Sequence, residues 1–179
     1  DGKSVETSMG LTPLGGIPMG SRSGDLDPSI ITYLMQKENL SVDDMNYILN
    51  KESGIYGVSG ISVDMRDIEV EAEAGGYHAQ LALDVFHYLT ACYIARCAVA
   101  MGGIDVLTFT AGVGEKGPIS RNAICKQLEF LGVKIDEVKN DVKGEEREIS
   151  ASDSKVKIYI VPTNEELMIA RETLRLVGV

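Results

Sequence analysis

The sequence has few groups that could form a disulfide framework or a metal centre. Its three cysteines, Cys92, Cys97 and Cys125, are odd in number and lack C-x-x-C spacing, so they predict neither disulfides nor a structural zinc site. The two histidines, His78 and His87, are nine positions apart and would point about 180° apart on one helix, so they cannot share a metal ion. A reducing, cytoplasmic location is therefore expected.

Positive charge is also scarce. The chain has 17 Lys and Arg residues against 27 Asp and Glu residues, which gives a formal net charge of -10. Affinity for a phosphate backbone comes mainly from clustered basic residues that displace counterions. This charge balance therefore argues against nucleic acid as a partner.

The sequence contains no long apolar run free of polar residues. The most apolar stretch, residues 77–101, is interrupted by Asp84, His87 and Arg96, which argues against a membrane span. A helix that is apolar around most of its circumference is instead expected between layers or in a subunit interface. No internal repeat or low-complexity segment is present.

Length and composition predict one domain with a substantial core, because 179 residues with 44% hydrophobic and 25% charged residues are ordinary for a globular protein. The chain begins with Asp1-Gly2, a strong hairpin-turn dipeptide, and residues 5–9 then nearly alternate in polarity. This pattern predicts a strand over residues 5–9 whose hairpin partner lies upstream. We therefore expect a fragment of a longer protein.

Helices and strands are expected to alternate after a glycine-rich loop over residues 10–24. Asp27 and Pro28 predict the start of a helix that runs to about Lys37, and Ser41 with Asp44 predicts a second start. The order predicts an α/β fold with a sheet covered by helices. The further elements expected are a loop over 54–62, an acidic helix after 64, a helix over 77–101, a buried strand over 105–110, a helix over 118–131, a strand near 133, a polar surface excursion over 136–154 with a short strand near 148, a strand over 156–161, and a last helix opened by a capping box of Thr163 and Glu166.

Three glycines, Gly112, Gly114 and Gly117, match G-x-G-x-x-G between an expected strand and an expected helix. Backbone N–H groups and the helix dipole favour phosphate at such a turn, so the pattern is typical of a dinucleotide site. Asp136, about twenty residues further on, suits the acidic ribose-binding position of that site. A glycine-rich turn without a ligand is the alternative, and the sequence contains no G-x-x-x-x-G-K-[ST] loop.

Arg22 lies among small residues in the glycine-rich loop, where a ligand could approach closely. Its guanidinium would suit the equatorial oxygens of a transferring phosphoryl group. A salt bridge to Asp25 or Asp27 explains the same residue equally well without any function. The sequence pattern leaves both interpretations open.

Two pairs of charged residues precede or open helices. Asp64 and Arg66 could serve a ribose hydroxyl and a phosphate, but capping of the helix and pairing of Arg66 with Asp67 are favoured on spacing alone. In the last helix, Glu166 is expected to complete the capping box, which leaves Glu165 free for a ligand such as hydrated Mg²⁺. The helix dipole also favours both carboxylates there without any function.

Six stretches of the chain match one enzyme family in the family's own order. They are residues 6–14 (ETSMGLTPL), 19–28 (MGSRSGDLDP), 53–60 (SGIYGVSG), 64–67 (DMRD), 109–115 (FTAGVGE) and 160–170 (IVPTNEELMIA). On these stretches the chain resembles the C-terminal part of the acetate kinases, in the acetate and sugar kinase, Hsp70 and actin superfamily. The resemblance spans nearly all of the chain.

The resemblance implies an α/β fold of the ribonuclease H-like type shared by actin, Hsp70 and the sugar kinases, with a mixed sheet covered by helices. Residues 1–179 would be a single C-terminal nucleotide-binding domain, without the N-terminal domain of the full enzyme. The implied reaction is the reversible, ATP-dependent phosphorylation of acetate to acetyl phosphate with Mg²⁺, ADP being the other nucleotide. The family is dimeric through this half, so a homodimer is expected.

The resemblance also implies roles for individual residues. Arg22 would stabilise the transferring phosphoryl group, and Glu165 would be the magnesium carboxylate. The nucleotide would be contacted by Asp64, Met65 and Arg66, and its adenosine part by Gly112, Val113, Gly114, Glu115 and Lys116.

Some family features differ here or lie outside the chain. The family commonly has Asn at the position of Lys116, Thr at that of Ser21 and Glu at that of Gly15, and the first difference replaces an amide beside the nucleotide by a charge. The substrate-binding arginine, the catalytic aspartate, the histidine and an Asn-Gly phosphate loop belong to upstream sequence. The isolated fragment is therefore expected to show negligible turnover.

Three alternatives remain at this point. The acceptor could be propionate or butyrate, because most of the acyl pocket lies upstream. The glycine spacing and Asp136 favour a nicotinamide-dinucleotide domain instead. The apolar helix over residues 77–101 would also suit a non-catalytic assembly module.

Overall fold

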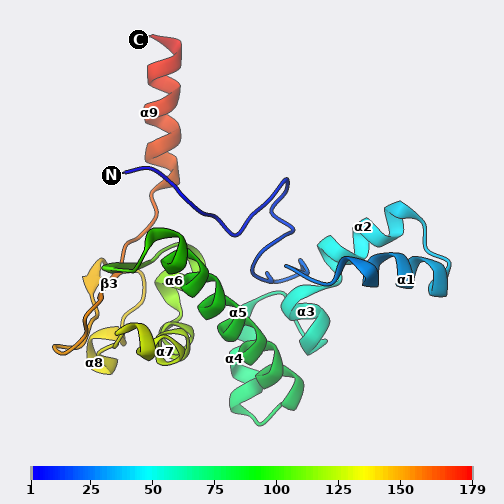
Figure 1. Cartoon of the computed structure of the whole chain (residues 1–179), viewed down its shortest axis with the longest axis horizontal. Helices are drawn as coiled ribbons and strands as arrows, with labels where there is room; N and C mark the ends of the chain where they lie inside the picture. Colours follow the sequence, from blue (N-terminus) through cyan, green and yellow to red (C-terminus); the bar gives the residue numbers. More distant parts are fainter. Residues whose placement is uncertain (1, 179) are drawn as a thin grey trace. The chain divides into compact units, whose positions relative to one another are not determined.

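The computed structural model describes residues 2–178 and divides into two compact units, one up to Ile104 and one from Asp105 onward (Figure 1). The first unit is helical, and the second holds a small sheet. The elements of the first unit are α1 (Pro28–Glu38), α2 (Val42–Lys51), α3 (Gly54–Ser59), α4 (Met65–Glu73) and α5 (Tyr77–Met101). Those of the second are β1 (Val106–Phe109), α6 (Ala111–Lys116), α7 (Pro118–Gln127), the 3₁₀ turn η1 (Glu129–Leu131), α8 (Glu137–Asn140), β2 (Arg147–Glu148), β3 (Lys157–Ile160) and α9 (Glu165–Val177).

The first two helices begin where the capping residues predicted. The Asp27 carboxylate accepts a hydrogen bond from the Ser29 N–H at 2.9 Å, and Pro28 occupies the first helical position of α1. At the start of α2, the Ser41 hydroxyl accepts from the Asp44 N–H while the Asp44 carboxylate accepts from the Ser41 N–H. Both caps satisfy N–H groups that have no partner within the helix.

The prediction of a loop over residues 54–62 is wrong, because residues 54–59 form the short helix α3. Two glycines in six residues lower the helix propensity of this segment, so its sequence favours a loop. Tertiary packing overrides that preference. Ile55 is almost fully buried in a cluster with Ile68, Ala82 and Leu83.

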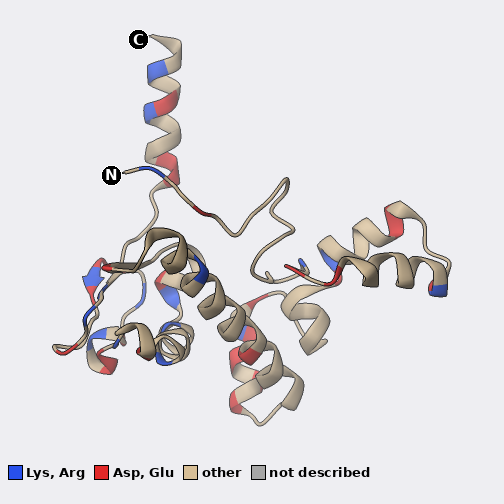
Figure 2. Cartoon of the chain, in the orientation of Figure 1, with Lys and Arg blue, Asp and Glu red and all other residues tan. Residues whose placement is uncertain are grey.

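The long helix α5 provides most of the surface against which α3 and α4 pack. Its buried residues recur at helical spacing along one side, while Tyr88 and Val99 remain exposed. Asp84 and Arg96 are its only Asp, Glu, Lys or Arg residues, and most of its length is therefore tan in Figure 2. None of the helices in residues 2–178 combines the length and the apolar character that a membrane crossing requires.

The strand expected over residues 5–9 is not formed. A strand needs a neighbouring strand to satisfy its backbone N–H and C=O groups. Within the described residues, 2–178, all ladder pairing lies in the sheet of the second unit and in a bridge between Ile135 and Ser150. The alternation in polarity therefore marked an extended segment rather than a strand.

The second unit is built on a three-stranded mixed sheet in the order β1-β3-β2. β1 pairs in parallel with β3, with Leu107 opposite Ile158, and β2 pairs antiparallel with β3. Leu107 and Phe109 face the core while Val106 is 52% exposed, so the strand predicted as buried is buried on one face only. The mixed sheet with helices confirms the predicted α/β class.

Two other boundaries in this unit differ from expectation. The helix expected over residues 118–131 ends at Gln127 and continues as the turn η1. The strand expected near residue 133 is absent from the described chain, apart from the bridge between Ile135 and Ser150. Gly132, whose φ of 84° suits glycine best, turns the chain between η1 and the bridge residue Ile135.

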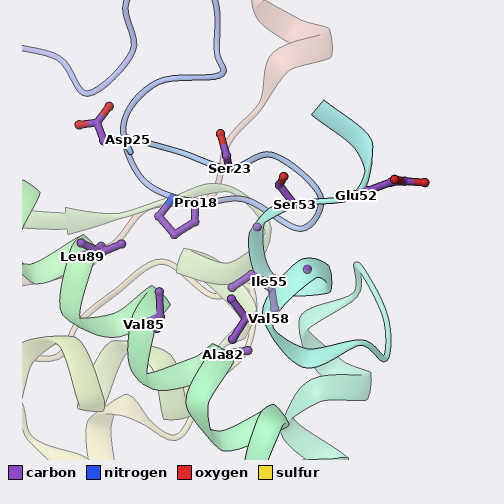
Figure 3. A pocket seen from close by; sticks show the side chains of 12 residues that line it. Pro18, Ser23, Asp25, Glu52, Ser53, Ile55, Val58, Ala82, Val85 and Leu89 are labelled. Carbon is purple, nitrogen blue, oxygen red and sulfur yellow. The ribbon is translucent and has the colours of Figure 1, made fainter. Parts of the chain in front are cut away.

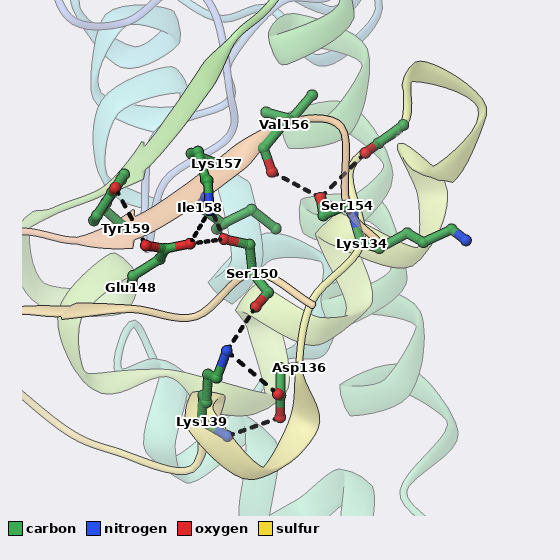
Figure 4. A network of polar contacts seen from close by, with 11 residues as sticks. Lys134, Asp136, Lys139, Glu148, Ser150, Ser154, Val156, Lys157, Ile158 and Tyr159 are labelled. Carbon is green, nitrogen blue, oxygen red and sulfur yellow. Dashed lines mark hydrogen bonds and ion pairs between the residues drawn. The ribbon is translucent and has the colours of Figure 1, made fainter. Parts of the chain in front are cut away.

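The polar stretch over residues 136–154 is not only a surface excursion. Ile149 and Ser150 are buried, and the Ser150 hydroxyl donates to the Glu148 carboxylate at 2.7 Å while accepting from the Ile158 N–H (Figure 4). Glu148 also pairs with Lys157 across the strands at 2.7 Å, and Lys139 donates to the Ser150 carbonyl at 3.1 Å. These polar contacts give the stretch a fixed structure that its composition does not indicate.

The buried histidine of α5 makes the stability of the fold depend on pH. His87 is 4% exposed and its ring meets Phe86 edge-on, and burial lowers its pKa below the ordinary value, with Asp84 opposing the shift. The unfolded chain therefore binds a proton more readily than the folded chain. The resulting stability is present above about pH 6.5 and is lost as the pH falls below that value.

We predict that the free energy of unfolding falls between pH 7.5 and pH 5.5, and that His87→Gln reduces this dependence. Denaturant titrations at both pH values measure the slope. The exposed His78 provides the matched control, because His78→Gln should keep the wild-type slope. A wild-type slope in His87→Gln would contradict the assignment.

Candidate active site

The guanidinium of Arg22 has no carboxylate partner among residues 2–178. Its Nη1 atom donates to the Met19 sulfur at 3.7 Å. The two acids considered as its partners are engaged elsewhere, because Asp25 accepts from the Gly16 N–H at 2.8 Å and from the Tyr93 hydroxyl, and Asp27 caps α1. The structure therefore does not support the interpretation of Arg22 as one half of a salt bridge.

The loop that carries Arg22 is fixed by backbone hydrogen bonds to the start of α3. The N–H groups of Ser53, Ile55 and Tyr56 donate to the carbonyl groups of Ser21, Met19 and Gly20 at 3.1, 2.9 and 2.8 Å. The Ser21 hydroxyl donates to the Asn50 carbonyl at 2.9 Å, so serine keeps the polar contact that a threonine hydroxyl could make there.

Gly54 permits this close approach. Its φ is 63°, and a Cβ atom at this position would collide with the Met19 carbonyl oxygen and lie 2.5 Å from that of Arg22. A side chain is therefore excluded both by the backbone conformation and by the space.

A cavity of about 400 Å³ lies beside this loop, and the sequence did not predict it. Figure 3 shows Ser23, Asp25 and Glu52 around it, with the apolar side chains Val85 and Leu89 of α5 on its other side. Arg22 is not among its lining residues. The cavity is therefore separate from the guanidinium that the sequence singled out.

Asp64 and Arg66 have the structural role that spacing favoured, with one difference. The Asp64 carboxylate caps α4 by accepting from the Arg66 N–H at 3.0 Å, and it also pairs with the Arg66 guanidinium, whose Nε lies 3.0 Å away. Asp67 instead accepts from the Ser62 hydroxyl. The Arg66 side chain is 86% exposed, and its guanidinium holds the pKa of Asp64 down at about 2.

The glycine-rich segment after β1 is the short helix α6 rather than an open turn. Ala111 has a positive φ of 57°, which lets the chain leave β1 and enter the helix at once. Gly114 packs on Phe109, while a Cβ atom at Gly112 would meet nothing within 4 Å. Asp136 caps α8 through the Val138 and Lys139 N–H groups, so the residue that suited the ribose-binding position has a structural role instead.

The expected capping box at the last helix is wrong. Asn164 is the N-cap of α9, and its side chain accepts from the Leu167 N–H at 3.1 Å.

Thr163 donates from both its N–H and its hydroxyl to one oxygen of Glu115, at 2.7 and 2.6 Å. These bonds lower the pKa of Glu115 and keep it ionised. Glu165 and Glu166 lie in the first turn of α9 and are both exposed.

Arg121, which no sequence pattern indicated, is the largest fully buried side chain among the described residues. Its guanidinium donates to the carbonyl groups of Gly114 and Glu115 at 2.8 and 3.0 Å, which are at the end of α6. It also donates to the Asn140 side chain and to the carbonyls of Asn140 and Val142. An arginine in a helix is usually exposed, so no local pattern marks this one.

The candidate residues are shared between the two units. Arg22, Asp64, Met65 and Arg66 belong to the first unit, and Gly112–Lys116 and Glu165 belong to the second. Within residues 2–178, no group of three or more His, Cys, Asp or Glu side chains is placed to hold a metal ion. Any metal carried by Glu165 would therefore need further ligands from elsewhere, such as water or phosphate oxygens.

Comparison with known proteins identifies the family. The model of the acetokinase family matches residues 1–171. The chain belongs to the acetokinase family. It is 58% identical over 178 residues to the acetate kinase of Dictyoglomus turgidum, and this alignment covers 99% of the chain and 44% of that relative. The acetate kinase of Acetivibrio thermocellus is 54% identical over 176 residues, with 98% and 44% covered.

Solved structures of family members have the same fold. The acetate kinase of Porphyromonas gingivalis matches with a TM-score of 0.90 at 43% identity, over 95% of this chain and 43% of that one. A propionate kinase of Francisella tularensis matches with a TM-score of 0.90 at 42% identity, over 96% and 44%. The ribonuclease H-like α/β fold is thereby confirmed. The chain spans less than half the length of these relatives.

Gly54 provides a test of how the Arg22 loop is held. We predict that Gly54→Ala lowers the free energy of unfolding by at least about 2 kcal/mol, from the unfavourable φ and from the collision with the loop. In a full-length enzyme that contains this chain, it should also lower kcat if Arg22 takes part in the reaction, because Arg22 would be displaced. Equilibrium unfolding and steady-state kinetics measure the two effects.

Gly60 is the matched control, since it has a φ of 70° but nothing within 4 Å of a Cβ atom. Gly60→Ala should cost about 1–2 kcal/mol of stability from backbone strain and leave kcat unchanged. Equal kinetic effects of the two substitutions would show that Gly54 does not set the position of Arg22.

Proposed function

We propose that the complete protein catalyses the reversible, ATP-dependent phosphorylation of acetate to acetyl phosphate, and that this chain supplies its nucleotide-binding and metal-binding part. The observation that carries the proposal is the guanidinium of Arg22, which has no acidic partner in the described residues although its loop is rigidly held. The family membership and the named acetate kinase relatives support the choice of reaction.

The reaction would proceed by in-line attack of an acetate oxygen on the γ-phosphoryl group. Enzymes of this class act mainly by positioning the reactants and by neutralising the charge that spreads over the phosphoryl oxygens. A planar guanidinium can donate two parallel hydrogen bonds to such oxygens. Arg22 is proposed to make these bonds in the transition state.

Residues 64–66 are proposed to contact the nucleotide, and α6 is proposed to contact its adenosine part. The Asp64–Arg66 pair is an exposed ion pair, and such pairs contribute only about 0–1 kcal/mol, so Arg66 could exchange Asp64 for a phosphate at little cost. Gly112 presents an open surface on α6, which suits close approach of a flat adenine ring. Lys116, which replaces the usual asparagine, is exposed beside it.

Glu165 is proposed as the carboxylate that binds Mg²⁺. One exposed carboxylate fits this ion, because Mg²⁺ in phosphoryl-transfer sites is commonly bound by one or two carboxylates together with water and substrate phosphates. The metal would neutralise charge on the phosphates. This chain would therefore provide only one of the ligands of the metal ion, the Glu165 carboxylate.

We propose a homodimer that forms through this half, because α5 keeps large apolar side chains exposed, Tyr88 at 59% and Val99 at 82%. A cytoplasmic location is proposed from the cysteine content. Neither nucleic acid nor a membrane is proposed as a partner, given the net charge of -10. Sedimentation of the full-length protein measures its oligomeric state, and assays with acetate, propionate and butyrate measure its acceptor preference.

Arg22 provides the kinetic test of the proposed function. In the full-length enzyme, Arg22→Ala and Arg22→Lys are each expected to lower kcat by at least about a hundredfold, with little change in the KM for ATP. Lysine keeps the charge but cannot reproduce the planar fork. Formation of acetyl phosphate measures both constants, and near-normal kcat in Arg22→Lys would remove Arg22 from the mechanism.

Gly112 provides the binding test. Gly112→Gln places a side chain in open space at a backbone conformation without a positive φ, so the fold should be kept. We predict that ATP with Mg²⁺ binds weakly to the isolated chain and that this substitution abolishes the heat of binding. Unchanged calorimetric heats in Gly112→Gln would exclude α6 as the adenosine site.

A further inference from the structure

The side chain of Glu115 points to a role other than contact with the nucleotide. One of its carboxylate oxygens accepts both hydrogen bonds that Thr163 can donate to it, from the backbone N–H at 2.7 Å and from the hydroxyl at 2.6 Å. Both residues belong to the second unit and are 48 positions apart in the chain. Hydrogen bonds to an ionised carboxylate are roughly twice as strong as those between neutral groups.

The backbone of Glu115 is itself held by the core of the unit. Its carbonyl accepts from the buried guanidinium of Arg121 at 3.0 Å and from the Gly144 N–H at 2.9 Å. Arg121 is in turn bound to Asn140 through both its Nε and its Nη2 atoms. The backbone of Glu115 is therefore held in place by the rest of the unit, and its carboxylate can determine where Thr163 lies.

Thr163 is the residue immediately before the N-cap of α9, and Glu165 is the first residue of that helix. None of the described residues of α9 is buried. Apolar packing therefore contributes little to the position of the start of the helix. The hydrogen bonds from Thr163 to Glu115, together with the end of β3, determine where α9 starts relative to α6.

We propose that Glu115 is a positioning residue that couples the nucleotide-binding segment to the metal-binding carboxylate. This inference rests on the proposed function and deepens it, since it assigns Glu115 to the placement of Glu165 rather than to a nucleotide contact. Through Thr163, Glu115 holds the first turn of α9 beside α6, so that Glu165 meets a metal ion carried by a nucleotide bound at α6. Loss of the contact would leave each binding group present but no longer aligned with the other.

The test uses the full-length enzyme and measures the Mg²⁺ concentration for half-maximal activity at saturating ATP, together with kcat and the KM for ATP. Calorimetry of ATP binding with and without Mg²⁺ measures the same metal requirement without turnover. Glu115→Ala is expected to raise the Mg²⁺ requirement about tenfold or more. Thr163→Val removes one of the two bonds and should raise it less, while Thr163→Ser keeps the hydroxyl and should remain near wild type. The double variant Glu115→Ala with Thr163→Val should be no worse than Glu115→Ala alone, because both act on one contact.

Glu146→Ala is the matched control, because Glu146 is an exposed glutamate in the segment between α8 and β2 of the same unit. The Mg²⁺ requirement of the Glu146→Ala variant should equal that of the wild type. If Glu115→Ala does not fold, Thr163→Val and Thr163→Ser alone decide the outcome. A lower melting temperature with an unchanged Mg²⁺ requirement in Glu115→Ala or Thr163→Val would make the contact purely structural and overturn the inference. A raised KM for ATP in Glu115→Ala with no effect of Thr163→Val on the metal would overturn it in favour of a direct nucleotide contact.

Glu165→Ala separates this inference from the proposed function. An unchanged Mg²⁺ requirement in Glu165→Ala would overturn the metal assignment and the coupling with it. A raised requirement in Glu165→Ala beside unchanged requirements in Glu115→Ala and Thr163→Val would overturn the coupling alone.

Discussion

The close approach of the Arg22 loop to the start of α3 is the constraint on which the first unit depends. Three backbone N–H groups of residues 53–56 donate to three carbonyl groups of the loop, and Gly54 leaves the space that this contact needs. Because Ile55 is buried in the helical core, the same residues connect a glycine-rich loop to the hydrophobic core of the unit. A loop of small residues, which would be mobile by itself, is thereby held in one conformation.

In the second unit, a buried guanidinium has the corresponding role. Arg121 donates only to neutral oxygen atoms, and burial lowers its pKa. A buried charge of this kind is tolerated only when its donors are satisfied, which requires the end of α6 and residues 140–142 to stay in place around it. Arg121 is therefore a basic residue that lies in the interior, where it holds two backbone segments together rather than binding a ligand.

The environments of the two candidate phosphate-binding arginines differ. Arg22 is half-buried and has no carboxylate partner among the described residues, whereas Arg66 is highly exposed and paired with Asp64. The first arrangement suits a group that acts on a transition state, because nothing must be displaced before it acts. The second suits a group that binds a nucleotide phosphate reversibly, because solvent already screens its pairing.

The sequence by itself determined the features that depend on neighbouring residues. Asp27 with Pro28, Ser41 with Asp44, and Asp64 all start helices where their patterns predicted, since a cap needs only the few residues after it. The six family-like stretches within residues 6–170 were enough to indicate the family. Only the tertiary structure decided that residues 5–9 form no strand, that residues 54–59 form a helix, and that Thr163 bonds to Glu115 rather than capping α9. Each of these outcomes depends on a partner far away in the chain, or on the absence of one within the described residues, and local propensity carries no information about such partners.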